Sequence, residues 1–271
     1  MIAFPPAKIN LGLDVLGKRE DGFHAIRSIF YPIPLTDILE IIPAPEVSGA
    51  VLTTSGLPIP GHPQDNLCVK AHTLLAAEHG IPGVRIHLRK QIPIGAGLGG
   101  GSADGTHALR VMNALFGLDL TDEALRNYAA ALGSDCPFFL QDGAMLVTGR
   151  GEHMVPHPTD LSGQFLVLVM PDFGVATGPA YGSITPSDRE DTLSDLHEHP
   201  MDAWQARAIN HFESGNLEAY RQVAHIKTAL QNAGAKYASM TGSGAAVYGI
   251  FEREITFTSP LPNCQTFGLQ L

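Results

Sequence analysis

The sequence predicts an α+β protein in which strands and helices are mixed without the regular alternation of a Rossmann fold. Residues 7–15 and 84–89 alternate apolar and polar side chains, a pattern typical of half-buried strands. A glycine-rich stretch, residues 93–105, follows the second of these strands and leads into a helical pattern. A second helix follows the first, where a Rossmann unit would have a parallel strand. This last observation makes a dinucleotide-binding dehydrogenase only a distant third hypothesis.

The first predicted strand has one apolar and one polar face. The apolar face holds Ile9, Leu11, Leu13 and Val15, and the polar face holds Lys8, Asn10, Gly12 and Asp14. Lys8 and Asn10 are either solvated strand residues, which is the commoner case, or a functional pair. The Asp21-Gly22 dipeptide predicts a turn. Phe23 and His24 leave this turn, and they could pack in a core or contact the ring of a ligand.

The segment between this strand and the glycine-rich stretch contains a strand at Ile38–Ile42 and a helix. Residues 43–65 are rich in proline and glycine and read as strand edges and loops. The helix begins at Asp65-Asn66. Its apolar face holds Leu67, Ala71, Leu74 and Leu75.

The glycine-rich stretch predicts an anion-binding loop. Glycine N–H groups can approach phosphate oxygens closely, and the N-terminus of the following helix, with Ser102 or Asp104 as a possible cap, favours negative charge. Gly95, Gly97 and Gly100 satisfy G-x-G-x-x-G, but no suitable strand follows, and no Lys-Ser/Thr pair is present to make a P-loop. The alternative is a flexible surface loop, which rarely lies between two well-patterned elements.

A second helix begins after Thr121, its predicted N-cap, and ends at Gly133. Asp135 follows directly, ahead of the apolar run Cys136–Leu140. A carboxylate at this place is partly enclosed by its neighbours. The pattern alone leaves two equal interpretations, a helix cap or a functional acid.

The remainder of the chain shows weaker patterns. Residues 149–158 lack periodic apolar positions and suggest a domain junction, and residues 165–170 predict a buried strand. Tyr181 follows a Thr-Gly-Pro loop, residues 187–200 suggest mobile surface, and residues 201–213 and 216–232 predict two helices. A second small glycine loop, with Gly242 and Gly244, leads into a strand that ends at Phe251.

Length and composition limit the class of protein. The chain has 271 residues, 44% hydrophobic and 16% charged, which is typical of one large or two closely packed globular domains. The formal net charge of −10 argues against nucleic acid or an anionic membrane as a main partner. We see no signal peptide, no apolar run of membrane-spanning length and no disulfide or zinc pattern among the three cysteines. The expected location is therefore cytoplasmic.

Four stretches together resemble the GHMP kinase superfamily. They are Pro6–Leu13 with Asp21–His24, the loop Pro93–Asp104, the segment Gly133–Phe139 and the motif Met240–Gly244. The resemblance is nearly continuous over residues 1–155 and weaker beyond. It implies a ribosomal-S5-type N-terminal domain, residues 1–155, and a ferredoxin-like C-terminal domain, residues 156–271, with the active site in the cleft between them.

The resemblance implies a kinase that transfers the γ-phosphate of ATP to a hydroxyl of a cytidine diphosphate-linked methylerythritol, on the non-mevalonate route to isoprenoid precursors. Asp135 would be the base and Lys8 its cationic partner. Asn10 would help to hold the substrate, Phe23 and Tyr181 would sandwich the cytosine, and His24 would bond to its edge. The ATP phosphates would lie against Pro93, Ile94, Gly95, Ala96, Gly97, Leu98, Gly99, Gly100, Gly101, Ser102 and Ala103. Phosphoryl transfer needs mainly positioning and charge stabilisation, which these parts supply.

Two features depart from the pattern of the superfamily members that the chain resembles. They usually carry Ser-Ser where this chain has Ser102-Ala103, so Mg²⁺ is expected but its ligands are unassigned. The expected C-terminal helix is also missing after Glu252, so another element must cover that part of the sheet.

Two further hypotheses remain open. A GHMP kinase acting on mevalonate or homoserine would have no ring for Phe23, His24 and Tyr181 to bind. A silent nucleotide-binding relative would have no need to retain both Lys8 and Asp135.

Overall fold

The computed structural model describes all residues, 1–271, and divides into two compact units that are interleaved along the chain. Unit 1 comprises Met1–Ala7, Leu35–Ile94 and Gly99–Asp142, and unit 2 comprises Lys8–Pro34, Gly95–Leu98 and Gly143–Leu271. The predicted domain boundary between residues 155 and 156 cuts the chain once, whereas these units alternate along it. The boundary therefore stays a prediction. None of the helices combines the length and apolarity needed to span a lipid bilayer.

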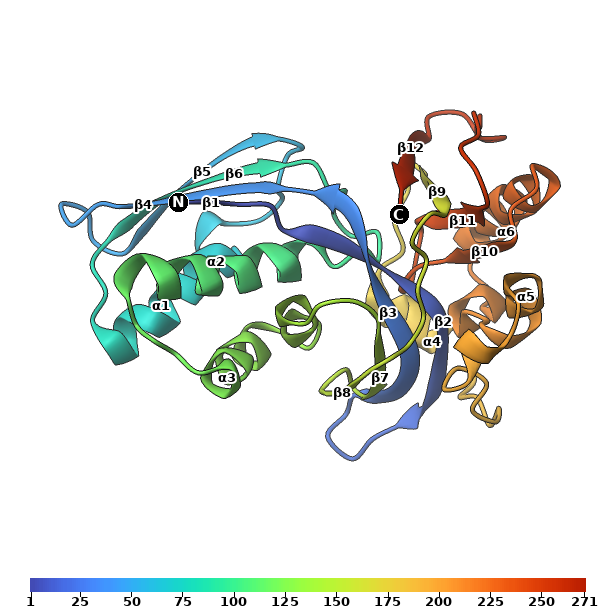
Figure 1. The fold of residues 1–271 in the computed structure, drawn as a ribbon, viewed down its shortest axis with the longest axis horizontal. Coiled ribbons are helices and arrows are strands. Elements are labelled where there is room, and N and C mark those ends of the chain that lie inside the picture. The colour runs from blue at the N-terminus through green and yellow to red at the C-terminus, as the bar shows by residue number, and fades with distance from the viewer. The chain divides into compact units, whose positions relative to one another are not determined.

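Unit 1 is a four-stranded sheet with helices on one face (Figure 1). The strand order is β1 (Ile2–Ala3), β4 (Ile38–Pro43), β6 (Val84–Lys90) and β5 (Ala50–Gly56). The helical segments are η1 (Pro63–Asp65), α1 (Leu67–His79), α2 (Gly100–Phe116), α3 (Asp122–Leu132) and η2 (Cys136–Leu140). β5 runs parallel to β6, so the region expected to hold only strand edges and loops contains a full strand. Its side chains are mostly exposed, which is why no apolar pattern marks it.

The local signals for the helices of unit 1 are largely confirmed. The Asn66 side chain caps α1 by accepting a hydrogen bond from the Cys68 N–H at 2.9 Å, and Thr121 caps α3 through the Ala124 N–H at 3.2 Å. The predicted cap of α2 is wrong. Its N-cap is Gly99, with φ +70°, and both Ser102 and Asp104 lie inside the helix. Only glycine takes up this left-handed conformation readily.

The core of unit 1 lies between the sheet and its helices. Val84, Ile86 and Leu88 of β6 are at most 1% exposed, so the predicted alternation is confirmed. They pack in one cluster with residues of α1, α2 and α3 that include Leu75, Leu109 and Leu125. Burial of each such side chain stabilises the fold by about 1.5–3 kcal/mol relative to exposure.

Unit 2 contains two four-stranded sheets. One has the order β2 (Pro6–Lys18), β3 (His24–Thr36), β7 (Met145–Gly149) and β8 (His153–Pro156). The other has the order β10 (Tyr237–Met240), β11 (Val247–Phe251), β9 (Phe165–Met170) and β12 (Gln265–Gln270). The helical segments are α4 (Thr177–Gly182), η3 (Leu196–Glu198), η4 (Met201–Ala203), α5 (Trp204–Arg207), η5 (His211–Ser214) and α6 (Glu218–Asn232).

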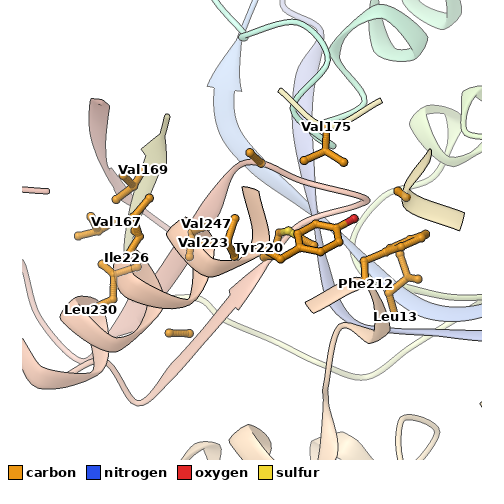
Figure 2. Packing of buried hydrophobic residues seen from close by; sticks show 14 of the residues in the cluster. Leu13, Val167, Val169, Val175, Phe212, Tyr220, Val223, Ile226, Leu230 and Val247 are labelled. Atoms are coloured by element: carbon orange, nitrogen blue, oxygen red, sulfur yellow. The ribbon is translucent and has the colours of Figure 1, made fainter. Parts of the chain in front are cut away.

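A single hydrophobic cluster joins β9, β11 and α6 in unit 2. Figure 2 shows Val167 and Val169 of β9 together with Ile226 and Leu230 of α6. Phe212 and Tyr220 extend the same cluster toward Leu13 of β2. Every residue of β9 is buried, as its apolar sequence predicts.

Strand β2 is buried on both faces, although its sequence predicts a half-buried strand. Lys8 is 3% exposed, Asn10 0% and Asp14 4%. The polar face is covered by partners from distant parts of the chain. Arg27 donates to Asp14 at 3.0 Å, and Thr241 contacts Asn10.

Two interpretations of residues 149–213 are corrected by the structure, and a third segment is more regular than expected. Within residues 149–158, where the sequence suggests a domain junction, β7 and β8 form a hairpin in unit 2. The hairpin is closed by Gly149, Gly151 and a hydrogen bond from the Arg150 N–H to the Glu152 carboxylate at 2.5 Å. β8 is largely exposed, so it carries no apolar pattern. The helix predicted at 201–213 is broken into η4, α5 and η5. Tyr181 lies on the short helix α4 rather than in a loop.

Residues 187–200 are anchored rather than purely a surface segment. Leu193 is 1% exposed and Leu196 0%. Arg27 donates to the carbonyl oxygens of Arg189 and Glu190 at 3.1 and 3.0 Å. The sequence hides this because two isolated leucines among acidic residues make no periodic pattern.

The C-terminal tail supplies a strand where the superfamily resemblance leads one to expect a helix. β12 pairs antiparallel with β9 along its whole length, from Gln265 opposite Met170 to Gln270 opposite Phe165. Ile255, Phe257 and Leu261 of the preceding segment pack against the cluster of unit 2. The tail therefore covers apolar surface that the missing helix leaves open.

Candidate active site

The second half of the glycine loop forms the beginning of α2 in unit 1. No side chain caps this helix, whose first residue is Gly100. Gly101 is exposed, and a Cβ added there would meet no atom within 4 Å. The first turn of α2 therefore presents backbone N–H groups on an open surface, the arrangement that binds anions.

Asp135 lies near this helix start within unit 1. The Thr106 hydroxyl of α2 donates to the Cys136 carbonyl at 2.9 Å, which ties the Asp135–Cys136 segment to α2. The side chain of Ser102 is hydrogen-bonded to the Cys136 thiol. Burial raises the pKa of this thiol to about 11. Asp135 itself is partly buried and forms no side-chain capping bond with η2. Asp135 therefore occupies the N-cap position of η2 without capping it through its side chain.

A buried charge cluster lies beside the start of α2, and the sequence analysis missed it. The Lys90 ammonium donates to Asp104 at 2.7 Å and also to Asp37. Asp37 accepts hydrogen bonds from the N–H groups of Gln91 and Ile92, at 2.5 and 2.9 Å. The cluster therefore fixes both the end of β6 and the first turns of α2. A signal was present: Lys90 continues the inward register of Val84, Ile86 and Leu88, and a buried lysine requires anionic partners.

Asp104 makes the stability of the protein sensitive to pH. Burial and the neighbouring Asp37 raise the pKa of Asp104 to about 8, against the opposing effect of Lys90. The folded state therefore keeps a proton that the unfolded chain releases near its ordinary value of 3.8. We therefore expect the stability that this proton contributes to be fully present below pH 3.8 and to be lost as pH rises to about 8, by up to about 1.4 kcal/mol per pH unit.

We expect urea unfolding between pH 5.5 and 8 to show this slope in the wild type and a shallower slope in Asp104→Asn. His107 of the same helix, whose pKa burial lowers, is present in both proteins, so it does not affect the comparison. Parallel slopes would contradict a protonated Asp104.

In unit 2, the first half of the glycine loop packs against the second glycine loop. The Thr241 hydroxyl contacts the Gly97 carbonyl oxygen at 3.1 Å, and a Cβ on Gly97 would lie 2.2 Å from the Thr241 carbonyl oxygen. Gly97 also has φ +78°. Only glycine fits here, both for conformation and for space. Strand β2 joins the same group, since the Lys8 N–H donates to Leu98 at 2.9 Å.

The side chains of Lys8 and Asn10 are hydrogen-bonded to each other in this part of unit 2. The Lys8 ammonium donates to Asn10 Oδ1 at 2.8 Å and lies 4.5 Å from the centre of the Phe30 ring. The interpretation of these residues as solvated strand decoration is therefore wrong.

The predicted aromatic residues gather elsewhere in unit 2. The His24 and Tyr181 rings stack, with centroids 4.3 Å apart and an interplanar angle of 15°, and Tyr181 meets Phe212 edge-on. Phe23 is 54% exposed, beneath the guanidinium of Arg150 at 5.1 Å. Of the two interpretations of Phe23, packing in a core is wrong. His24 and Tyr181 are brought together, and Phe23 follows His24 on an exposed turn.

Each unit thus assembles some of the predicted site residues. Unit 1 brings Asp135 to the half of the loop that contains Gly99–Ala103. Unit 2 brings Lys8 and Asn10 to Gly95–Leu98, and His24 to Tyr181. Some residues that contact these groups were not predicted as site residues. They are Thr241, Gly242 and the Asp37–Lys90–Asp104 cluster.

Comparison with known proteins shows the family of the chain. The GHMP kinases N terminal domain matches residues 66–143, and the GHMP kinases C terminal domain matches residues 194–256. A 4-diphosphocytidyl-2-C-methyl-D-erythritol kinase of Cytophaga hutchinsonii is 42% identical over 269 residues, 98% of each chain. The enzyme of the same name from Bacteroides fragilis is 45% identical over 259 residues, 95% of this chain and 94% of the relative.

A solved structure is similar along nearly the whole fold. The crystal structure of a 4-(cytidine 5'-diphospho)-2C-methyl-D-erythritol kinase matches with a TM-score of 0.75 and 30% identity, over 92% of this chain and 90% of that one. The chain therefore belongs to the GHMP kinases, which use ATP. Within them it lies in the family of the two relatives just described. The mixed two-domain fold predicted from the sequence is confirmed.

Proposed function

We propose that the protein transfers the γ-phosphate of ATP to a hydroxyl of 4-diphosphocytidyl-2-C-methyl-D-erythritol, in the synthesis of isoprenoid precursors. The observation that carries this proposal is the likeness over 98% of the chain to a relative of that named activity. The open start of α2 with Asp135 beside it, and the bonded Lys8–Asn10 pair, add the parts that phosphoryl transfer requires.

In the proposed reaction the substrate hydroxyl oxygen attacks the γ-phosphorus, and the bond to the β-phosphate oxygen breaks to release ADP. Asp135 takes the hydroxyl proton. Lys8 stabilises the negative charge on the transferring group. The backbone of residues 93–103 holds the phosphates.

The expected Mg²⁺ fits a site made mainly by ATP. The structure has no group of three or more His, Cys, Asp or Glu side chains that could hold a metal ion. Mg²⁺ in kinases is commonly bound by few protein ligands together with substrate phosphates and water. Because Ala103 supplies no hydroxyl, we propose phosphate oxygens and water as its main ligands. Its charge would offset that of the phosphates.

The function is tested by measuring ATP consumption with a panel of alcohols. We expect turnover with 4-diphosphocytidyl-2-C-methyl-D-erythritol and little with mevalonate, homoserine or methylerythritol lacking the cytidine. Equal turnover with an alcohol that has no cytidine would favour another GHMP kinase activity. No turnover with any of them would favour a silent nucleotide-binding protein.

The phosphate site is tested by Gly101→Val. We expect the KM for ATP to rise at least about tenfold, or ~1.4 kcal/mol, because the side chain would cover the open N-terminus of α2. Stability should be kept, since the position has free space and valine is better tolerated in a helix than glycine. Ala131→Val, at an exposed position of α3, is the control. An unchanged KM for ATP in a folded Gly101→Val protein would place the phosphates elsewhere.

The cytosine site is tested by Tyr181→Ala. We expect weaker binding of the alcohol substrate by about 1–3 kcal/mol, the range for loss of an aromatic ring that stacks on a base. The variant also removes the ring on which His24 stacks. The KM for ATP should not change, and Tyr181→Phe, which keeps the ring, should behave as the wild type does. A selective loss of ATP affinity would assign Tyr181 to the nucleotide instead.

A further inference from the structure

We propose that Asn10 is a positioning residue for Lys8 and that, through Thr241, it aligns the Lys8 ammonium with the tip of the phosphate loop at Gly97. This inference rests on the proposed function, in which Lys8 acts on the transferring phosphate. It differs from the prediction that Asn10 holds the substrate directly.

The carbonyl oxygen of the Asn10 side chain is already saturated with hydrogen bonds. Asn10 is 0% exposed. Its Oδ1 accepts hydrogen bonds from Lys8 Nζ at 2.8 Å, the Gly242 N–H at 2.9 Å and Thr241 Oγ1 at 3.0 Å. Its Nδ2 donates to Ser28 Oγ at 2.9 Å. A carbonyl oxygen has two lone pairs, so three donors leave no capacity for a substrate hydroxyl.

The hydrogen bond to Asn10 also holds the Lys8 ammonium in place. A lysine ammonium sits on a flexible four-carbon stem and reaches a fixed position only where its surroundings hold it. Asn10 lies two residues along β2 and on the same face. Its Oδ1 and the Phe30 ring are two features that hold Nζ in place, at 2.8 Å and at 4.5 Å from the ring centre.

Asn10 is also connected, through Thr241, to the proposed phosphate loop. The Asn10 N–H donates to Thr241 Oγ1 at 3.1 Å. The single proton of that hydroxyl is shared between Asn10 Oδ1 and the Gly97 carbonyl oxygen, at 3.0 and 3.1 Å. Lys8, Asn10, Thr241 and Gly97 thus form one continuous hydrogen-bonded chain, all within unit 2. A shift of Asn10 moves the ammonium relative to the loop that carries the phosphates.

The experiment compares kcat with KM in Asn10→Ala and Thr241→Val. A misplaced catalytic group costs about a hundredfold in rate for a displacement of about 1 Å. We therefore expect kcat to fall about a hundredfold in Asn10→Ala and about tenfold in Thr241→Val, with the KM of the alcohol substrate unchanged. Thr228→Val, which removes an exposed hydroxyl from α6, is the matched control with wild-type kcat.

Combining Asn10→Ala with Lys8→Met separates positioning from direct binding. If Asn10 acts through Lys8, the double variant is no slower than Lys8→Met alone. Multiplied losses, or a raised KM of the alcohol with normal kcat, overturn the inference. If Lys8→Met itself keeps normal kcat, the proposed role of Lys8 has failed instead. Thermal melts identify variants that do not fold, and Thr241→Val, which does not alter Asn10, then decides alone: normal kcat overturns the inference.

Discussion

Replacing Asp135 with Asn should lower kcat by about 10²–10⁴-fold, the usual contribution of a general base. Asparagine has nearly the same size and still accepts a hydrogen bond, but it cannot take the proton of the attacking hydroxyl. The segment should keep its position, because the Thr106–Cys136 bond that ties it to α2 does not involve the Asp135 side chain. The KM for ATP should change little.

Asp142→Asn is the matched control for this prediction. Asp142 lies in the same unit, seven residues further along the chain, and is exposed. It should keep the wild-type rate. Near-full kcat of Asp135→Asn at saturating substrate would falsify the assignment, and the base would have to be another residue.

Local patterns were enough to predict the elements that carry their own signals. The alternation of β6, the start of α1 at Asn66, the Thr121 cap and the apolar run of β9 depend on residues close in sequence, and each is confirmed. The order of strand, glycine loop and helix was predictable for the same reason. The resemblance supplied the rest of the fold.

The structural features that the sequence could not show depend on contacts with residues far away in the chain. The polar face of β2 is buried because Thr241, more than 200 residues away, packs on Asn10. β12 exists because its backbone pairs with β9, while its side chains are mostly exposed and show no clear pattern. Residues 187–200 are held by Arg27, which bonds to backbone carbonyls that any sequence would offer.

The charge cluster is an intermediate case. Lys90 stands at an inward position of β6, and that conflict between charge and register was visible in the sequence. Its partners were not, because Asp37 and Asp104 lie 53 and 14 residues away. A charged residue in the apolar register of a predicted strand is therefore a signal to search for buried partners, even where those partners cannot be named.

Replacing Lys8 with Met should be as severe as the loss of Asp135. Methionine keeps the apolar stem, but it removes the ammonium that we propose to stabilise charge on the transferring phosphate. Of the hydrogen bonds that Asn10 Oδ1 accepts, those from Thr241 and Gly242 remain in this variant. The buried oxygen therefore stays satisfied, and the fold should persist. We expect kcat to fall about 10²–10⁴-fold. Lys18→Met, at an exposed position of the same strand, is the control.

The double variant of Lys8→Met and Asp135→Asn tests whether the two residues act on one reacting group. Residues that work as a unit show strongly non-additive losses, because removal of either one already disables the step. We therefore expect the double variant to lose much less than the product of the two single losses. The measurement is kcat at saturating ATP and alcohol for all four proteins. Fully multiplied losses would mean that Lys8 and Asp135 act independently of each other, and would contradict their action as one unit.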